Sequence, residues 1–118
     1  MPLTVSQYVD GVSEKCALPQ SPVLVTFDDG FADFAENAVP ALASRNIVST
    51  LYVTTGVLAG GLAEWVLPSA NMLAAADLPR LEAAGVEIGA HSHTHRQMDL
   101  LTESEVTTEL SRNASSLE

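Results

Sequence analysis

Short apolar segments rich in β-branched residues alternate with helical segments along this chain. The apolar segments are residues 23–27 (VLVTF), 47–55 (IVSTLYVTT) and 86–92 (VEIGAHS). Each is expected to form a buried strand, and the alternation with helices predicts parallel strands joined by helical crossovers. Three such units are too few to close a barrel, which usually has about eight strands. We therefore expect an α/β fold of about three parallel strands, equivalent to a partial (β/α) barrel with an open sheet edge.

Helical periodicity recurs in four segments, residues 3–17, 32–45, 72–85 and 101–118. Thr4 is a candidate N-cap, so the chain should have an N-terminal helix. Pro40 should kink the second helix or start a new first turn, and Gly85 stands where a helix C-terminus prefers glycine. Thr102 and Glu105 have the spacing of a capping box, which predicts the start of the last helix.

The composition excludes several classes of function. Of 118 residues, 47% are hydrophobic and 17% are charged, which is typical of a globular domain. The net charge is −10 with five basic residues, so no nucleic acid partner is expected. No apolar run reaches the roughly 18 residues of a membrane span, and no signal peptide is visible, so the chain as written is expected to be cytoplasmic. The single cysteine, Cys16, excludes an intrachain disulfide.

Polar clusters follow the first and the third predicted strands. Asp28 and Asp29 follow the first strand, and the three histidines of the chain, His91, His93 and His95, follow the third. Because the carboxyl ends of parallel strands form one rim, the two clusters should face each other. Two imidazoles and a carboxylate around an open position are typical of a catalytic zinc site. One aspartate would be a ligand and the other a general base, while His93 is expected to point away.

Simpler interpretations of these residues stay open. DDG is a common turn sequence, and HSHTH could be a surface cluster that binds metal only adventitiously. Asp33 and Glu36 are expected on the solvated face of a helix, and Asp99 in a turn. Trp65 either lines the site or packs within residues 56–65, which are glycine-rich and expected to form a loop. An α/β phosphohydrolase is less favoured, because that chemistry usually spaces its acids by one residue and leaves the histidines unexplained.

Two motifs in this order, each after a strand, form a specific signal. TFDDG (Thr26 to Gly30) is the first, and His91, Ser92 and His95 form the second, H-[ST]-x-x-H. The stretch LEAAGVEIGAHSHTH is similar as a whole to the approach to that second motif. On these motifs the chain resembles the polysaccharide deacetylase family, the NodB-homology domain of carbohydrate esterase family 4.

The resemblance implies a distorted (β/α) barrel, a divalent metal that is usually zinc or cobalt, and hydrolysis of an N-acetyl group on a sugar. Transferred residue by residue, Asp28 would be the general base, and Asp29, His91 and His95 the metal ligands. Ser92 would steady the histidine loop through a hydrogen bond. The implied function is that of a metal-dependent N-deacetylase, a hydrolase whose substrate is an N-acetylated polysaccharide or glycan.

The far end of the chain departs from the family pattern. The later family motifs contain an arginine, a tryptophan and a leucine–x–histidine that supplies the general acid, whereas no histidine follows His95 here. We therefore expect residues 1–118 to be a NodB-like domain truncated before its C-terminal motifs. The alternative is a non-catalytic metal- or glycan-binding fragment of such a domain. Copies of the chain could also associate through the open sheet edge.

Overall fold

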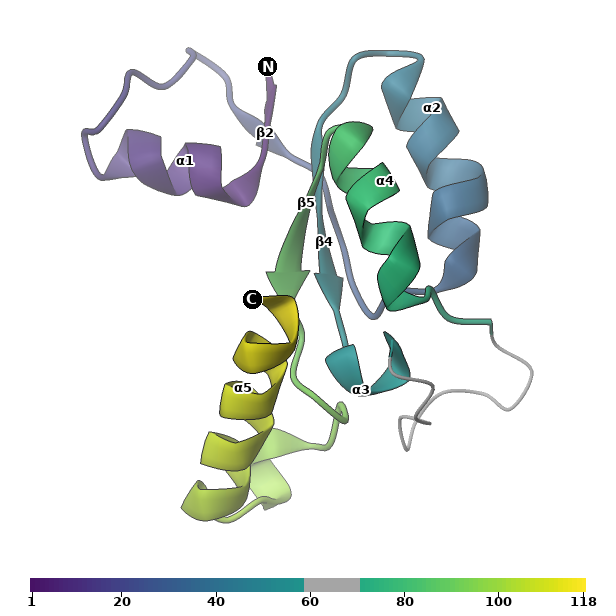
Figure 1. The fold of residues 1–118 in the computed structure, drawn as a ribbon. Helices are drawn as coiled ribbons and strands as arrows, with labels where there is room; N and C mark the ends of the chain where they lie inside the picture. Colours follow the sequence, from purple (N-terminus) through teal and green to yellow (C-terminus); the bar gives the residue numbers. More distant parts are fainter. Residues whose placement is uncertain (59–70) are drawn as a thin grey trace.

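The predicted parallel sheet is present in the computed structural model, which describes residues 1–58 and 71–118 (Figure 1). Its strands, in spatial order, are β3 (Thr26–Phe27), β4 (Ser49–Val53) and β5 (Val86–Ala90). All neighbours are parallel, and the register places Ala90 beside Val53. The α/β fold class is confirmed, and both polar clusters of the sequence begin at the same edge of the sheet.

The apolar core lies between this sheet and two helices, α2 (Val39–Ala43) and α4 (Leu78–Ala83). The two helices lie together on one side of the strands (Figure 1). The buried core residues are Phe34, Leu51, Val53, Leu73, Leu81 and Val86. Phe27 packs on Phe34 with ring centroids 4.7 Å apart. Because burial of apolar surface is the main stabilising contribution, this layer holds the carboxyl ends of β3 and β4 in place.

Proline stands in the first turn of two helices, and for Pro40 this is one of the two predicted alternatives. A π-helical turn, Phe34–Ala38, precedes α2, and Pro40 stands in the first turn of α2. Pro79 has the same position in α4. Proline is tolerated there because its missing N–H would have no partner within the helix. Gly85 follows α4 with a φ of +87°, so its role in ending that helix is also confirmed.

The first apolar segment is not the single buried strand that its composition predicts. It divides at Val25 into β2 (Val23–Leu24) and β3, and β2 pairs instead with a short strand, β1 (Pro2–Leu3), in a separate parallel sheet. Val23 is 53% exposed and Leu24 38% exposed. The prediction of burial was wrong because β2 lies apart from α2 and α4, at the margin of the molecule (Figure 1).

The N-terminal helix, α1 (Val5–Val12), is attached to the amino end of the sheet. Thr4 caps it as predicted, since its side chain accepts a hydrogen bond from the Gln7 N–H at 3.3 Å. The Glu87 carboxylate of β5 accepts two further backbone bonds, from the N–H groups of Val5 at 3.0 Å and Ser6 at 3.2 Å. A carboxylate at a helix N-terminus satisfies orphan donors and interacts favourably with the helix dipole.

Two further predictions concern the segments around the site. Residues 56–65 were expected to be a loop, but their first part belongs to a short helix, α3 (Thr55–Leu58), so that part was wrong. The remainder, with Trp65, lies outside the described residues. The last helix, α5 (Glu103–Leu117), begins at Thr102 with the predicted capping box and lies beside the carboxyl end of β5 (Figure 1). Within residues 1–58 and 71–118, no helix is both long and apolar enough to cross a membrane.

Candidate metal centre

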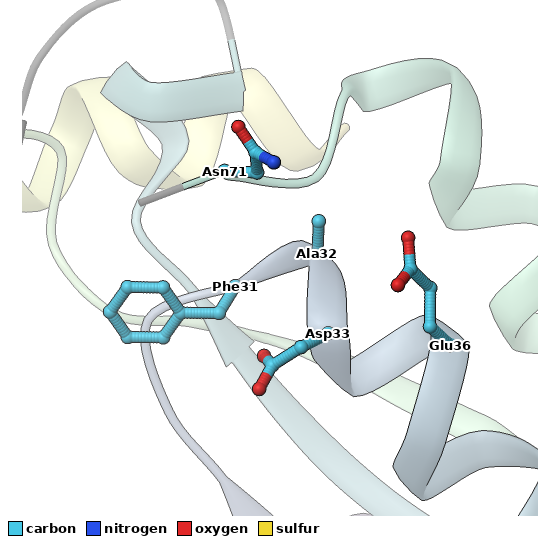
Figure 2. A pocket seen from close by; sticks show the side chains of 5 residues that line it. All are labelled: Phe31, Ala32, Asp33, Glu36 and Asn71. Atoms are coloured by element: carbon cyan, nitrogen blue, oxygen red, sulfur yellow. The ribbon is translucent and has the colours of Figure 1, made fainter. Parts of the chain in front are cut away.

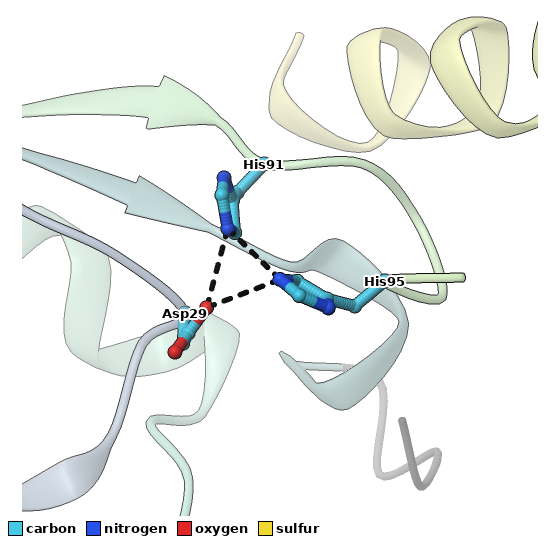
Figure 3. A group of neighbouring side chains, drawn as sticks. All are labelled: Asp29, His91 and His95. Carbon is cyan, nitrogen blue, oxygen red and sulfur yellow. Dashed lines mark hydrogen bonds and ion pairs between the residues drawn. The ribbon is translucent and has the colours of Figure 1, made fainter. Parts of the chain in front are cut away.

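Three side chains from the two polar clusters meet at the carboxyl edge of the sheet (Figure 3). The Nε2 atoms of His91 and His95 lie 3.0 Å apart. The Asp29 Oδ1 atom is 3.2 Å from the His91 nitrogen and 3.4 Å from the His95 nitrogen. All three residues are partly buried, so the group is reachable from solvent while most of its surroundings are protein.

The donor set and its spacing fit a divalent transition metal. Zinc binds imidazole nitrogen and carboxylate oxygen at about 2.0–2.2 Å in tetrahedral geometry, which puts two donor atoms about 3.3 Å apart. The three donor separations here are 3.0, 3.2 and 3.4 Å. With three protein donors, a tetrahedral ion would keep one position for water or substrate. Asp29, His91 and His95 could therefore hold a metal of the catalytic type.

A tight turn after β3 directs Asp29 into this group. Asp29 has a φ of +78° and Gly30 a φ of +97°, a conformation that aspartate adopts more readily than most residues. The Asp29 carbonyl accepts a bond from the Thr54 N–H at 3.2 Å, and the Gly30 carbonyl accepts one from the Leu73 N–H at 2.9 Å. The turn is thus held by backbone bonds to the chain on both sides of it.

The histidine loop, residues 91–95, also contains left-handed residues. Ser92 has a φ of +60° and His95 a φ of +59°. The Ser92 Oγ atom accepts a hydrogen bond from the His95 N–H at 3.1 Å, so the predicted hydrogen bond within the loop is present. This bend brings the first and last residues of the loop onto the same side, four positions apart in the sequence.

His93 lies outside the group, as expected from its place between the other two. Its Nδ1 atom is 2.9 Å from the Thr55 Oγ1 atom, at the start of α3. The ring therefore helps to attach the loop to α3. His93 therefore forms a hydrogen bond within the protein and is not one of the candidate ligands.

Asp28, the candidate base, has different surroundings from its neighbour Asp29. It is exposed and lines a cavity of about 200 Å³ whose other lining residues are Phe27, Phe31, Asp33, Phe34, Asn37 and Ala38. The φ of Asp29 turns the chain between the two carboxylates. The carboxylates of Asp28 and Asp29 therefore lie in different surroundings: Asp29 lies beside the histidines, and Asp28 lines the cavity.

Two larger cavities adjoin these residues. One, of about 340 Å³, is lined by His91 and His95 together with Ala90, Ser92, Arg96 and Met98. The other, of about 460 Å³, is lined by Phe31, Ala32, Asp33, Glu36 and Asn71 (Figure 2). Asp33 and Glu36 are exposed, as predicted, but they also face this hollow. Of these cavities in the described part of the chain, the one at the histidines is lined by two of the three candidate ligands, His91 and His95.

Two polar residues of α5, Glu109 and Asn113, are buried against the histidine loop and were missed in the sequence. They are 7% and 1% exposed. Burial raises the pKa of Glu109. Hydrogen bonds from the Thr94 side chain and from the backbone N–H groups of Thr94 and His93 lower this pKa by a larger amount, so it lies below its ordinary value. The available signal was a pair of polar residues four apart on a helix face that also contains Leu117.

Comparisons with known proteins identify the family to which this chain belongs. A sequence model of the family described as polysaccharide deacetylase matches residues 15–118. The chain belongs to the polysaccharide deacetylase family. A comparison with curated protein sequences found no match.

Solved structures of deacetylases are similar to this chain over most of its length. The Streptococcus pyogenes deacetylase PplD in complex with acetate has a TM-score of 0.85 and 23% identity over 99% of this chain and 49% of that one. IcaB from Ammonifex degensii has a TM-score of 0.81 and 22% identity, over 99% and 53%. The BpsB deacetylase domain from Bordetella bronchiseptica has a TM-score of 0.67 and 28% identity, over 78% and 38%. The chain thus has part of the NodB-type barrel and spans about half the length of these structures.

Proposed function

We propose that this chain provides the metal-binding part of an N-deacetylase that hydrolyses acetamido groups of N-acetylated sugars in a polysaccharide or glycan. The observation on which the proposal rests most is the spacing of the Asp29, His91 and His95 donor atoms, 3.0 to 3.4 Å. Membership of the polysaccharide deacetylase family supports the reaction class. PplD, which shares the fold, is described as a deacetylase in complex with acetate, the acid such a reaction releases.

In this proposal Asp29, His91 and His95 hold zinc, with cobalt as a substitute. A bound divalent cation would polarise the acetyl carbonyl and increase the acidity of a water molecule. Asp28 accepts the proton of the attacking water, whose oxygen bonds to the acyl carbon. The C–N bond then breaks as the leaving nitrogen takes up a proton, from Asp28 or from the general acid that a longer protein would supply, and acetate and the free amine of the sugar are released.

The exposed position of Asp28 suits the role of a base. It is adjacent in the sequence to the proposed ligand Asp29 and lines a separate cavity. A carboxylate outside the ligand set keeps its lone pairs for proton transfer.

The experiment separates ligand from base by two matched substitutions. Asp29→Asn should abolish zinc binding in calorimetry, because an amide is a poor replacement for a charged ligand. Asp28→Asn should bind zinc like the parent chain and release no acetate from an N-acetylglucosamine oligomer. Equal loss of zinc in both variants would contradict these roles. Zinc binding without acetate release in the parent would favour the alternative of a non-catalytic metal- or glycan-binding chain.

Two other expectations from the sequence stay predictions. One is that residues 1–118 form a NodB-like domain without its C-terminal motifs, in which case a longer protein would supply the general acid. The other is association of copies through an open sheet edge, since β3 and β5 are the outer strands of the described sheet. Sedimentation analysis of the chain tests the second of these.

A further inference from the structure

We propose that Glu109 and Asn113 of α5 are positioning residues that hold the histidine loop in the shape required for metal binding. The inference rests on the proposed function, because it concerns how His91 and His95 are held toward Asp29. Neither residue contacts the donor atoms of the candidate site. Their effect is exerted through the backbone of residues 92–94, between the two histidines.

Glu109 receives three hydrogen bonds from the middle of the loop. Its carboxylate accepts bonds from the His93 N–H at 3.0 Å, the Thr94 N–H at 2.7 Å and the Thr94 hydroxyl at 2.6 Å. Bonds to an ionised acceptor are shorter and stronger than neutral ones, and burial of Glu109 strengthens them further. Successive N–H groups can point at one carboxylate only while the loop is bent, so Glu109 selects the bent shape.

Asn113 lies one helical turn further along α5 and holds the other side of the bend. Its Nδ2 group donates to the Ser92 carbonyl, and also lies 3.3 Å from the Val53 carbonyl and from the Thr55 Oγ1 atom. It thereby joins the loop to the end of β4 and the start of α3. Residues four apart share one face of a helix, so one rigid helix fixes both sides of the loop.

The backbone of the loop is also held by the chain after β4. The Ser92 carbonyl accepts a bond from the Thr55 N–H at 3.3 Å, and the His93 carbonyl accepts one from the Gly56 N–H at 2.7 Å. A Cβ atom at Gly56 would clash with that carbonyl oxygen, so the approach requires glycine. The loop is therefore clamped between α5 and α3, and left-handed Ser92 and His95 keep their conformations within the clamp.

The test uses the 118-residue chain with Co²⁺ as the metal probe. Glu109→Ala and Asn113→Ala should weaken Co²⁺ binding in calorimetry by about 10- to 100-fold, the usual range for residues that orient metal ligands. Glu109→Gln should lie between Glu109→Ala and the parent, because an amide oxygen can still accept one of the N–H bonds. The visible absorption of bound Co²⁺ should change as well, since it reports the geometry of the ligands. Glu103→Gln, an exposed glutamate of the same helix, is the matched control and should bind like the parent.

Parent-like affinity and spectrum in both alanine variants would overturn the proposal. If the alanine variants do not fold, Glu109→Gln and Thr94→Val, which removes only the shortest of the three bonds, apply the same criteria. Amide exchange of His93 and Thr94 in the metal-free chain gives an independent measurement, and Glu109→Ala should accelerate it. A parent chain that binds no Co²⁺ would contradict the proposed function. In that case, unchanged amide exchange in Glu109→Ala would overturn the positioning role, and faster exchange would support it.

Discussion

At the amino end of the sheet the Glu87 carboxylate accepts bonds from Val5, Ser6 and the Thr50 hydroxyl, the last at 2.6 Å. At the carboxyl end, Glu109 accepts an equivalent set from His93 and Thr94, again with a threonine hydroxyl at 2.6 Å. Both glutamates thus join two consecutive backbone N–H groups and one hydroxyl. What differs is the segment that each one holds.

Glu87 holds the first turn of α1, whose residues contribute nothing to the candidate metal centre. Glu109 holds a loop whose first and last residues are two of the three candidate ligands. The same interaction therefore stabilises the fold at one end and arranges the site at the other. Because α1 has no buried residue, it gains little stability from packing. The hydrogen bonds to Glu87 attach this helix to the sheet. The four predictions that follow test whether stability and metal binding are separated in this way.

The largest effect is expected from His95→Ala, which removes one of the three donor atoms. Zinc affinity should fall by more than about 100-fold, beyond the range for residues that only orient ligands. The unfolding temperature of the metal-free chain should change little, because the His95 side chain is partly exposed. Calorimetry and thermal unfolding on the same sample measure both quantities. Undiminished zinc affinity would show that the carboxyl end is not a metal site.

Glu87→Ala should have the opposite effect, a loss of stability without a loss of zinc affinity. It leaves the Ser6 N–H and the Thr50 hydroxyl without their acceptor, while the Val5 N–H keeps the Thr50 Oγ1 atom, at an expected cost of about 1–3 kcal/mol in the free energy of unfolding. Denaturant unfolding measures this loss. Zinc affinity, measured where the variant is folded, should equal that of the parent. A large loss of affinity in folded Glu87→Ala would mean that the two ends of the sheet are coupled.

Low pH should reduce the free energy of unfolding, because it protonates the glutamates at both ends of the sheet, Glu87 and Glu109. Burial raises the pKa of each glutamate, but the hydrogen bonds lower it more, so both folded-state pKa values lie below the ordinary one. The resulting stability is complete above the pKa of the unfolded chain, about 4.3, and is lost as the pH falls through the lower folded values. Urea unfolding of the metal-free chain at pH 7 and below pH 4 should show the decrease. Glu87→Gln should show a smaller decrease than the parent, and an identical decrease would remove Glu87 from the explanation.

The smallest effect is expected from Ser92→Ala. This variant removes one neutral acceptor of the His95 N–H within the loop, an interaction worth about 0.5–1.5 kcal/mol. Zinc affinity should fall about tenfold or less. Ser104→Ala, at an exposed serine of α5, is the matched control in the same calorimetric titration and should bind zinc like the parent. A loss larger than that of Glu109→Ala would mean that the internal bond of the loop matters more than its attachment to α5.

Local features of the chain could be predicted well from the sequence. Thr4 and Thr102 both cap helices as their spacing indicates, and Pro40 starts a helical turn. Capping and proline effects depend on groups within four residues, so the sequence contains all the necessary information. That an aspartate after β3 would meet the histidines after β5 was also predictable, because the carboxyl ends of parallel strands form one rim, and the family resemblance implied that it would be Asp29.

Features that depend on which particular segments pair or pack together could not be predicted. The segment VLVTF has the composition of a buried strand, yet Val23 and Leu24 are exposed because β2 pairs with β1 and not with β4. Composition reports what a strand could bury but does not specify which neighbour it pairs with. α3 was likewise assigned to a loop, although its N–H groups bind the carbonyls of the histidine loop.

The residue types and spacing of the candidate ligands follow from the sequence alone, because strand ends and the four-residue separation of His91 and His95 are local properties. The tertiary structure alone decided that Asp28 and Asp29 have separate surroundings, through the left-handed turn at Asp29. It also decided that Glu109 and Asn113, 14 and 18 residues beyond His95 in the sequence, hold the loop. The Glu109 carboxylate acquires its hydrogen-bond donors only when α5 packs against the histidine loop. These donors are backbone N–H groups, which every residue except proline has, so the sequence does not reveal them.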